Sequence, residues 1–444
     1  MPQASYHFPQ GFLWGTATSS HQVEGQNTNN NWFEWERRGK INQGHTSGPA
    51  LDWWNGKWEE DLDRAAAGGQ NAHRFSVEWS RVQPQPGVWD EQALKKYRRM
   101  AQGMYDRGIT PVVTLHHFTN PLWLEEMGGW ENPEVIPLFG AYAQRIVSLL
   151  GDYVTLWCTF NEPNVYAVLA YLEGSFPPGK ENLGKTFQVI KNLAVAHAAA
   201  YHRIHEQQYE ARVGLVIHYR DLIPERNWYP PDRLITWLIS QLFHDTFPSA
   251  ACSGRLKLPL SWSLIPDGKG TQDFLGLNYY TREVVRFSPG SPRQLFSSRS
   301  LPKDAPRSET EFISHSPEGF YRAMKWALQF DIPLMITENG VDDSSGSLRP
   351  RYLAEHIHQM GQGIDQGWPI KGYFHWTLVD NFEWERGWTQ KFGLWSLDRT
   401  TGQRHKRPSA DLYQQICRRN QLSASMVEKY APQSLKTIFP DRED

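Results

Sequence analysis

Two short segments each place a glutamate where an apolar run gives way to turn-forming residues. Glu162 lies within residues 159–163 (TFNEP), after the apolar run 153–160, and Glu338 lies within residues 336–340 (ITENG), after the run 333–337. If the two runs are neighbouring strands of a barrel, their ends bring both carboxyl groups into one site. Such a pair can cleave a glycosidic bond: one group protonates the leaving oxygen, and the other attacks the anomeric carbon or activates water.

The elements that must position these glutamates alternate between strand and helix. Apolar residues recur at helical spacing in 94–107, 135–149, 320–328 and 353–364, and Gly108 and Gly151 follow the first two segments. The predicted strands are 12–17, 72–77, 111–115, 153–160, 213–217, 274–278, 333–337 and 370–376.

Eight strands separated by helices predict an α/β fold, a (β/α)8 TIM barrel, as a single domain with elaborated loops after the strands. We expect the domain to span residues 1–444, with its core at about 8–418 and a C-terminal tail at 419–444. A doubly wound sheet is the alternative, but no Gly-x-Gly-x-x-Gly turn follows the first strand, so a nucleotide site is unsupported.

The bulk composition narrows the class of protein. The 46 Lys and Arg residues nearly balance the 48 Asp and Glu residues, and this gives no support for a nucleic-acid or anionic-membrane partner. Three cysteines are too few for a disulfide scaffold, the first residues lack the pattern of a signal peptide, and no run of about 18 apolar residues occurs. We therefore expect a cytoplasmic protein without membrane spans. The histidines show no metal-ligand spacing, so we expect no metal or other cofactor.

Polar and aromatic residues recur at the predicted strand ends, where a barrel has its active mouth. The chain has 20 Trp, and flat aromatic rings suit the apolar faces of sugars. The candidates at or near strand ends are Gln22, Glu24, Arg74, His116, His117, Asn161, Glu162, Asn278, Tyr279, Tyr280, Glu338, Trp376, Glu383 and Trp384. Taken alone, His116 is best interpreted as a core histidine. The shared position of these candidates at strand ends supports an active site more strongly than any single residue does.

Five segments resemble the signature segments of family 1 glycoside hydrolases, the β-glucosidase/β-galactosidase family. They are residues 8–25 (FPQGFLWGTATSSHQVEG), 159–163, 336–340, 376–384 (WTLVDNFEW) and 406–409 (KRPS). The resemblance runs from about residue 8 to 418, with matching order and spacing.

The resemblance implies a role for each matching residue. Glu162 resembles the general acid/base and Glu338 the nucleophile of a retaining, two-step mechanism, whose carboxyl groups should lie about 5–5.5 Å apart. Arg74 and Tyr280 resemble the partners that keep the nucleophile ionised, and Asn278 supports the pair. The implied substrate-binding residues are Gln22, His117, Asn161 and Glu383 as ligands of sugar hydroxyls, Trp376 as a stacking platform and Trp384 as an edge contact.

The chain departs from the family pattern after the third strand. Residues 117–121 read HFTNP where the family often has HWDLP, so Phe118 replaces a tryptophan and one wall of the sugar pocket should differ. Glu162 argues against a thioglucosidase, which resembles this chain but has Gln there, and Glu383 would repel a 6-phosphorylated sugar. Non-catalytic relatives have lost one carboxylate, and both remain here.

We therefore expect a retaining β-glycosidase that takes small-molecule β-glycosides and oligosaccharides, such as cellobiose, and releases terminal β-D-glucosyl residues. Galactosyl or fucosyl specificity, a transglycosylase and a sugar-binding barrel without turnover stay open as alternatives. Residues 286–311 are expected to form a surface loop rather than an entrance lid, and the tail after 419 either packs on the barrel or makes a subunit contact.

Overall fold

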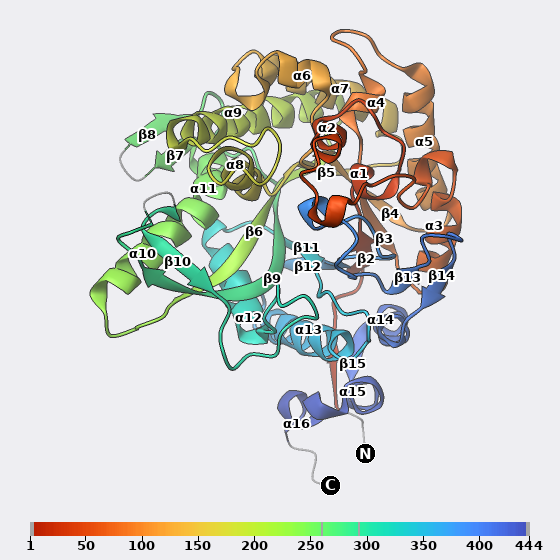
Figure 1. Cartoon of the computed structure of the whole chain (residues 1–444). Helices are drawn as coiled ribbons and strands as arrows, with labels where there is room; N and C mark the ends of the chain where they lie inside the picture. Colours follow the sequence, from red (N-terminus) through yellow and green to blue (C-terminus); the bar gives the residue numbers. More distant parts are fainter. Residues whose placement is uncertain (1–3, 259–260, 292–293, 441–444) are drawn as a thin grey trace.

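Eight parallel strands close into a barrel at the centre of the molecule (Figure 1). The computed structural model describes residues 4–258, 261–291 and 294–440. Strand order around the barrel follows the chain, and the last strand pairs with the first. The strands are β2 (Leu13–Ala17), β3 (Ala72–Ser76), β4 (Thr110–His116), β5 (Leu156–Asn161), β6 (Arg212–Pro224), β9 (Phe274–Phe287), β11 (Leu334–Asn339) and β12 (Ile370–His375). The predicted (β/α)8 barrel is confirmed.

The barrel strands fill their own interior. Each contributes one residue to a separate buried cluster, as expected for layers of side chains inside such a barrel. Cys158 is the contribution of β5, and its free thiol packs there as a small apolar group. The other contributions are Ala17, Ala72, Val112, Val216, Phe274, Met335 and Phe374.

Helices separate the strands and cover the outside of the barrel (Figure 1). Asp90 precedes α5, and its side chain accepts hydrogen bonds from the first free backbone N–H groups of that helix. Gly108, at φ 71°, follows the helix and turns the chain towards β4. The predicted helices are confirmed as α5, α7, α12 and α13. The longer helices are α3 (Trp58–Ala67), α5 (Glu91–Asp106), α7 (Val135–Leu150), α8 (Pro163–Tyr171), α9 (Leu183–Gln207), α10 (Pro230–Ser240), α11 (Thr246–Ser253), α12 (Pro317–Ala327), α13 (Arg349–Asp365) and α14 (Pro408–Arg419).

Short elements fill the loops around the two ends of the barrel. The short helices are α1 (Ser20–Val23), α2 (Asn31–Arg37), η1 (Asn42–Gly44), η2 (Trp53–Asn55), α4 (Trp79–Val82), α6 (Leu122–Glu126), η3 (Gly129–Glu131), the π-helix η4 (Gln241–Asp245), η6 (Leu328–Phe330) and η7 (Trp384–Arg386). The strand pairs are β7 (Arg255–Leu258) with β8 (Ser261–Leu264), and β13 (Trp395–Leu397) with β14 (Arg404–Lys406). Among the described residues, no helix has the length and apolar character that crossing a membrane requires.

Two predicted boundaries were wrong. β5 begins at Leu156 rather than at 153, because residues 151–153 form the turn that follows α7. β6 and β9 continue beyond the barrel as a two-stranded ribbon, and β10 (Ser297–Ser300) adds to β9 in antiparallel register. Part of the expected loop 286–311 is therefore sheet. The ribbon is held on the molecule by Val285 of β9, which is fully buried against helix α10. Residues 292–293 of that stretch lie outside the described part of the chain.

The C-terminal tail packs on the barrel. β15 (Gln421–Ser423) pairs with β1 (Ser5–His7) near the N-terminus, and α15 (Ala424–Tyr430), η8 (Pro432–Ser434) and α16 (Leu435–Ile438) follow. The Ser434 hydroxyl donates to Glu355 on α13 at 2.7 Å, which ties the tail to a barrel helix. Helices α15 and α16 lie at the bottom of the view in Figure 1. Residues 441–444 of the tail lie outside the described part of the chain.

Candidate active site

The two predicted glutamates line one cavity at the carboxyl ends of the barrel strands. Glu338 is part of β11, and Glu162 follows β5 directly. Both are buried, at 4 % and 6 % exposure, and the cavity that they share has a volume of about 110 Å³. Glu162 has φ 44° and ψ 55°, a backbone conformation that is costly for a residue other than glycine. The chain therefore uses a strained turn between β5 and α8 to aim this carboxyl group into the cavity.

Glu338 is surrounded by donors on both carboxylate oxygens. Arg74 donates from Nη1 to Oε1 at 2.6 Å, and the Tyr280 hydroxyl donates to Oε2 at 2.6 Å. Arg74 is fully buried, and its guanidinium keeps its charge there. Burial raises the pKa of Glu338 to about 7, and both partners act against that rise. Arg74 and Tyr280 therefore stabilise the charged, nucleophilic form of Glu338 against the effect of burial.

Within the described residues, Glu162 has hydrogen-bonding partners on one oxygen alone. Asn278 donates from Nδ2 to Oε1 at 2.7 Å, and His218 lies with Nδ1 2.9 Å from the same Oε1. No hydrogen bond joins Oε2 to another described residue. Burial acts to raise the pKa of Glu162, but His218, Asn278 and Arg220 outweigh it and lower that pKa.

A continuous set of hydrogen bonds connects the two carboxyl groups. Arg74 donates from Nη2 to Oδ1 of Asn161 at 2.7 Å, and Asn278 donates to the same oxygen at 3.2 Å. The Thr337 hydroxyl donates to Oδ1 of Asn278 at 2.7 Å and so fixes which way that amide points. Because Arg74 also bonds Glu338 and Asn278 also bonds Glu162, the shared oxygen of Asn161 links the two carboxyl groups.

Aromatic rings form one wall of the cavity. The His117 ring lies nearly parallel to Trp376 and to Trp384, with ring centres 6.1 and 5.8 Å away. The Asn161 amide donates to Nε2 of His117 at 3.1 Å, and this places the ring proton on Nδ1. Nδ1 of His117 has no partner among the described residues. Burial lowers the pKa of His117 well below its usual value, so the ring is a neutral donor.

Gln22 and Glu383 meet across almost the whole length of the chain. Nε2 of Gln22 donates to Oε2 of Glu383 at 3.3 Å and to the carbonyl oxygen of Phe382 at 2.7 Å. Gln22 is fully buried behind Glu383 and does not itself line the cavity. Burial, together with Glu385 and Glu338, raises the pKa of Glu383 well above its usual value. Hydroxyl groups of a sugar would supply the donors that the Glu383 carboxylate needs.

The structure thus brings together the site residues that the family resemblance implies, with Gln22, Arg74 and Asn278 just behind the cavity surface. Two other strand-end candidates lie away from it: Glu24 pairs with Arg81 at 2.7 Å, and Tyr279 donates to a backbone carbonyl. His116 is a core histidine as predicted, bonded through Nε2 to Asn120 at 3.0 Å. Phe118, the departure from the family pattern, does line the cavity and packs edge-on against Trp384. No group of three or more His, Cys, Asp or Glu in the described part of the chain is arranged to hold a metal ion.

Sequence reasoning missed one side of the cavity. His218 lies one residue past the predicted strand 213–217, so its position at a strand end was a usable signal. Arg220 and Glu283 come from the extended ribbon of β6 and β9, where they form an ion pair at 2.9 Å. The missed lining residues also include Val165, Leu169, Phe176, Phe312, Glu385, Arg386, Gln390 and Phe392.

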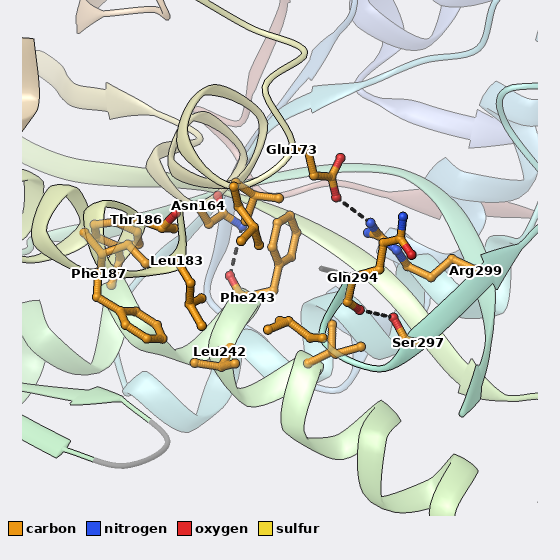
Figure 2. Close-up of a pocket in the computed structure, with 16 residues that line it drawn as sticks. Asn164, Glu173, Leu183, Thr186, Phe187, Leu242, Phe243, Gln294, Ser297 and Arg299 are labelled. Carbon is orange, nitrogen blue, oxygen red and sulfur yellow. Dashed lines mark hydrogen bonds and ion pairs between the residues drawn. The ribbon is translucent and has the colours of Figure 1, made fainter. Parts of the chain in front are cut away.

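A second, largely apolar cavity of about 70 Å³ lies on the other side of α8 (Figure 2). Asn164 and Val168 line this cavity, whereas Val165 and Leu169 of the same helix line the catalytic one. Across its rim, Arg299 donates to Glu173 at 2.7 Å (Figure 2). The helix that begins at Glu162 therefore separates two cavities, and only one of them contains the carboxylate pair.

A (β/α)8 barrel with two buried, linked carboxyl groups and an aromatic wall at its strand ends defines the class of the protein: it is a glycosidase-type barrel. The chain matches the family model for glycosyl hydrolase family 1 over residues 4–422. It therefore belongs to glycosyl hydrolase family 1 and is a hydrolase of that family.

Similar proteins support this membership, and the chain matches each of them over nearly its whole length. The chain is 32 % identical to β-glucosidase A of Thermotoga maritima, covering 94 % of this chain and 98 % of the relative. It is 30 % identical to a β-galactosidase of Pyrococcus woesei, covering 95 % and 99 %. Its structure is similar to that of a β-glycosidase from Pyrococcus horikoshii, with a TM-score of 0.90, 36 % identity, and coverage of 96 % and 98 %.

Proposed function

We propose that this hydrolase is a retaining β-glycosidase in which Glu338 is the nucleophile and Glu162 the general acid/base. The main support is the difference between the two carboxyl groups. Glu338 has a fixed positive charge and a hydroxyl donor on its two oxygens, whereas the described residues contact Glu162 through one oxygen and leave its second oxygen without a partner. A negative charge stabilised on Glu338 suits a nucleophile, and an oxygen of Glu162 left open towards the substrate suits a proton donor.

The reaction follows from these surroundings. One oxygen of Glu338 bonds to the anomeric carbon while the bond from that carbon to the leaving oxygen breaks. Glu162 gives its proton to the leaving oxygen and becomes a carboxylate. In the second step Glu162 takes a proton from water, the water oxygen bonds to the anomeric carbon, and Glu338 leaves as a carboxylate. The predicted carboxyl separation of about 5–5.5 Å belongs to this mechanism, and a separation near 9 Å would indicate inversion instead.

The proposed substrates carry a terminal β-D-glucosyl residue on a small aglycone, with cellobiose among them and galactosyl or fucosyl residues as further candidates. Trp376 is the proposed stacking platform, and Trp384 the edge contact. Support comes from the hydroxyl partners that the cavity offers: the carboxylate of Glu383, the Nδ1 donor of His117 and the amide of Asn161, with Gln22 behind them. The Thermotoga relative is named a β-glucosidase and the Pyrococcus woesei relative a β-galactosidase.

A panel of para-nitrophenyl glycosides tests this proposal: β-glucoside, β-galactoside, β-fucoside and β-glucoside 6-phosphate. We expect turnover of the unphosphorylated sugars and none of the phosphorylated one, because Glu383 would repel a phosphate. Activity on the phosphorylated sugar alone would contradict the proposed role of Glu383. A folded protein that binds glucosides without turnover would instead be a sugar-binding barrel, and transfer to an added sugar acceptor would reveal a transglycosylase.

Two substitutions separate the roles of the carboxyl groups. Glu338→Gln keeps the shape of the side chain and should abolish turnover of every glycoside, because no nucleophile remains. Glu162→Ala should reduce cleavage of a poor leaving group, such as methanol, far more than cleavage of 2,4-dinitrophenol, which needs little protonation. Equal losses for both leaving groups would contradict the acid role of Glu162.

We also propose a cytoplasmic location and a single catalytic domain made of the entire chain. The support for the location is that Cys158, Cys252 and Cys417 are all free thiols. The support for the domain is that the tail packs on α13 and pairs with the N-terminal strand. Fractionation of cells, and limited proteolysis at the tail, would test the two statements separately.

A further inference from the structure

His218 is the one histidine ring that the described residues place against the proposed acid/base, and the reaction described above does not use it. It lies in β6 just beyond the barrel part of the strand and is 9 % exposed. Its Nδ1 is 2.9 Å from Oε1 of Glu162, and Asn278 donates to that same oxygen at 2.7 Å. With Oε1 occupied by two donors, Oε2 is the oxygen that can carry a proton towards the substrate.

Arg220 fixes which nitrogen of His218 carries the proton. Its Nε donates to Nε2 of His218 at 3.4 Å. A guanidinium can only donate, so Nε2 must be the acceptor nitrogen and the ring proton must be on Nδ1. The tautomer that these contacts select therefore carries its proton on Nδ1 and donates it to Glu162.

The ring and the backbone of His218 are held from three sides. Its ring stacks on Tyr280 with centres 5.7 Å apart and an angle of 17°, and the edge of Phe243 from the π-helix η4 packs against it. Asn164 on α8 donates to the His218 carbonyl oxygen at 2.8 Å. It also donates to the Phe243 carbonyl oxygen at 3.0 Å, the contact drawn in Figure 2. Since α8 begins at Glu162, the same helix fixes both partners of the contact.

We propose that His218 is a positioning residue for the acid/base: its ring donates from Nδ1 to Oε1 of Glu162, directs the catalytic proton to Oε2, and stabilises the carboxylate that remains after proton transfer. This inference rests on the proposed function. In the first step only one proton moves, from Oε2 to the leaving oxygen, and the Nδ1–H bond persists while the charge on Glu162 develops. Such a donor, fixed before the reaction, helps most where charge develops.

Other charged or titratable groups also face the contact between His218 and Glu162, and a test must leave them unchanged. They are Arg220 on β6, His244 on η4, Tyr280 and Glu283 on β9, Glu338 on β11, and Glu383 and Glu385 at η7. Within the described residues, none of these groups bonds Glu162 directly. Removal of the His218 ring therefore removes one hydrogen-bond donor to Glu162 and leaves the surrounding charged groups in place. Because His218 contributes to lowering the pKa of Glu162, its removal should raise that pKa.

The test compares wild type, His218→Phe and His244→Phe in the pH dependence of kcat/KM with a poor leaving group. Loss of kcat/KM at alkaline pH reports deprotonation of the acid. We expect His218→Phe to move that limb to higher pH by about one unit, the size of one hydrogen bond to a charged group. His244→Phe is the matched control: its ring bonds Ser240 and the Arg220 backbone but not Glu162, and the limb should stay in place.

The experiment distinguishes failure of this inference from failure of the proposed function. A wild type without β-glycosidase turnover would overturn the proposed function and this inference together. Turnover with an alkaline limb that does not move in His218→Phe, while kcat/KM falls equally at every pH, would overturn the inference alone and leave His218 a packing residue. If His218→Phe does not fold, His218→Asn is measured in the same way, and an unmoved limb in that variant equally refutes the role.

Discussion

Removal of the Tyr280 hydroxyl should change the pH dependence of the enzyme more than its fold. The hydroxyl donates to Oε2 of Glu338 at 2.6 Å inside a site where Glu338 is only 4 % exposed. A hydrogen bond to a charged group contributes roughly 1.5–3 kcal/mol, and one pKa unit corresponds to about 1.4 kcal/mol. Tyr280→Phe should therefore raise the pKa of Glu338 by about one to two units.

The sign of the effect follows from the role of Glu338. A nucleophile must be ionised, so a higher pKa leaves a smaller reactive fraction at low pH, and the acidic limb of kcat/KM should move to higher pH. The assay is kcat/KM for an aryl β-glucoside across the pH range. At a pH below both values of the pKa, the variant should be slower than wild type by about ten- to a hundredfold from this cause alone.

Tyr279→Phe is the matched control for this experiment. The neighbouring hydroxyl points away from the cavity and donates to the Ser316 carbonyl oxygen at 2.8 Å. Its loss should lower the free energy of unfolding by about 1 kcal/mol without moving the acidic limb. Acidic limbs that coincide in Tyr280→Phe and wild type would refute the reasoning that Tyr280 keeps the nucleophile charged.

Three further predictions concern stability and cofactors. Arg407→Ala removes the bidentate partner of buried Asp380, bonded at 2.8 and 2.9 Å, and should lower the free energy of unfolding by about 3–5 kcal/mol in urea denaturation; an unchanged midpoint would contradict it. Burial acts to raise the pKa of Glu355, but His315 and its other partners lower it to about 2, so its contribution to stability is present above about pH 4.5 and is lost as the pH falls towards 2. Glu355→Gln should therefore flatten the fall of stability in that window, on the order of 3 kcal/mol, and an unchanged acid denaturation curve would argue against this. Dialysis against EDTA should leave kcat/KM unchanged, and restoration of a lost activity by an added metal would overturn the expectation of a metal-free site.

The barrel and the catalytic pair could be predicted because both depend on local signals. Buried parallel strands appear as continuous apolar runs, and polar residues directly after them, such as Glu162 and Tyr280, must point into the mouth of the barrel. The same rule applied to the predicted strand 213–217 would have identified His218, because β6 continues past that point.

The rest of the site depends on contacts that no local pattern encodes. Gln22 meets Glu383, and Arg74 meets Glu338, through barrel closure, and the bonded partner of each lies hundreds of residues along the chain. Phe312 reaches the cavity from an irregular loop and Arg386 from the short helix η7, and the course of both segments is set by tertiary packing and not by periodicity. Residues 286–311, which include the end of β9 and all of β10, are predicted as a loop because polar residues dominate there, and the pairing of β10 with β9 depends on tertiary packing.

Covalent trapping of the nucleophile tests the central claim most directly. The protein is incubated with 2,4-dinitrophenyl 2-deoxy-2-fluoro-β-D-glucoside, whose fluorine slows both steps and whose good leaving group restores the first, and peptides are then analysed by mass spectrometry. We predict a burst of one equivalent of dinitrophenol and one fluoroglucosyl group on Glu338. A fluoroglucosyl group on another residue, or turnover of aryl glucosides in a protein that forms no adduct, would contradict the retaining mechanism with Glu338 as its nucleophile.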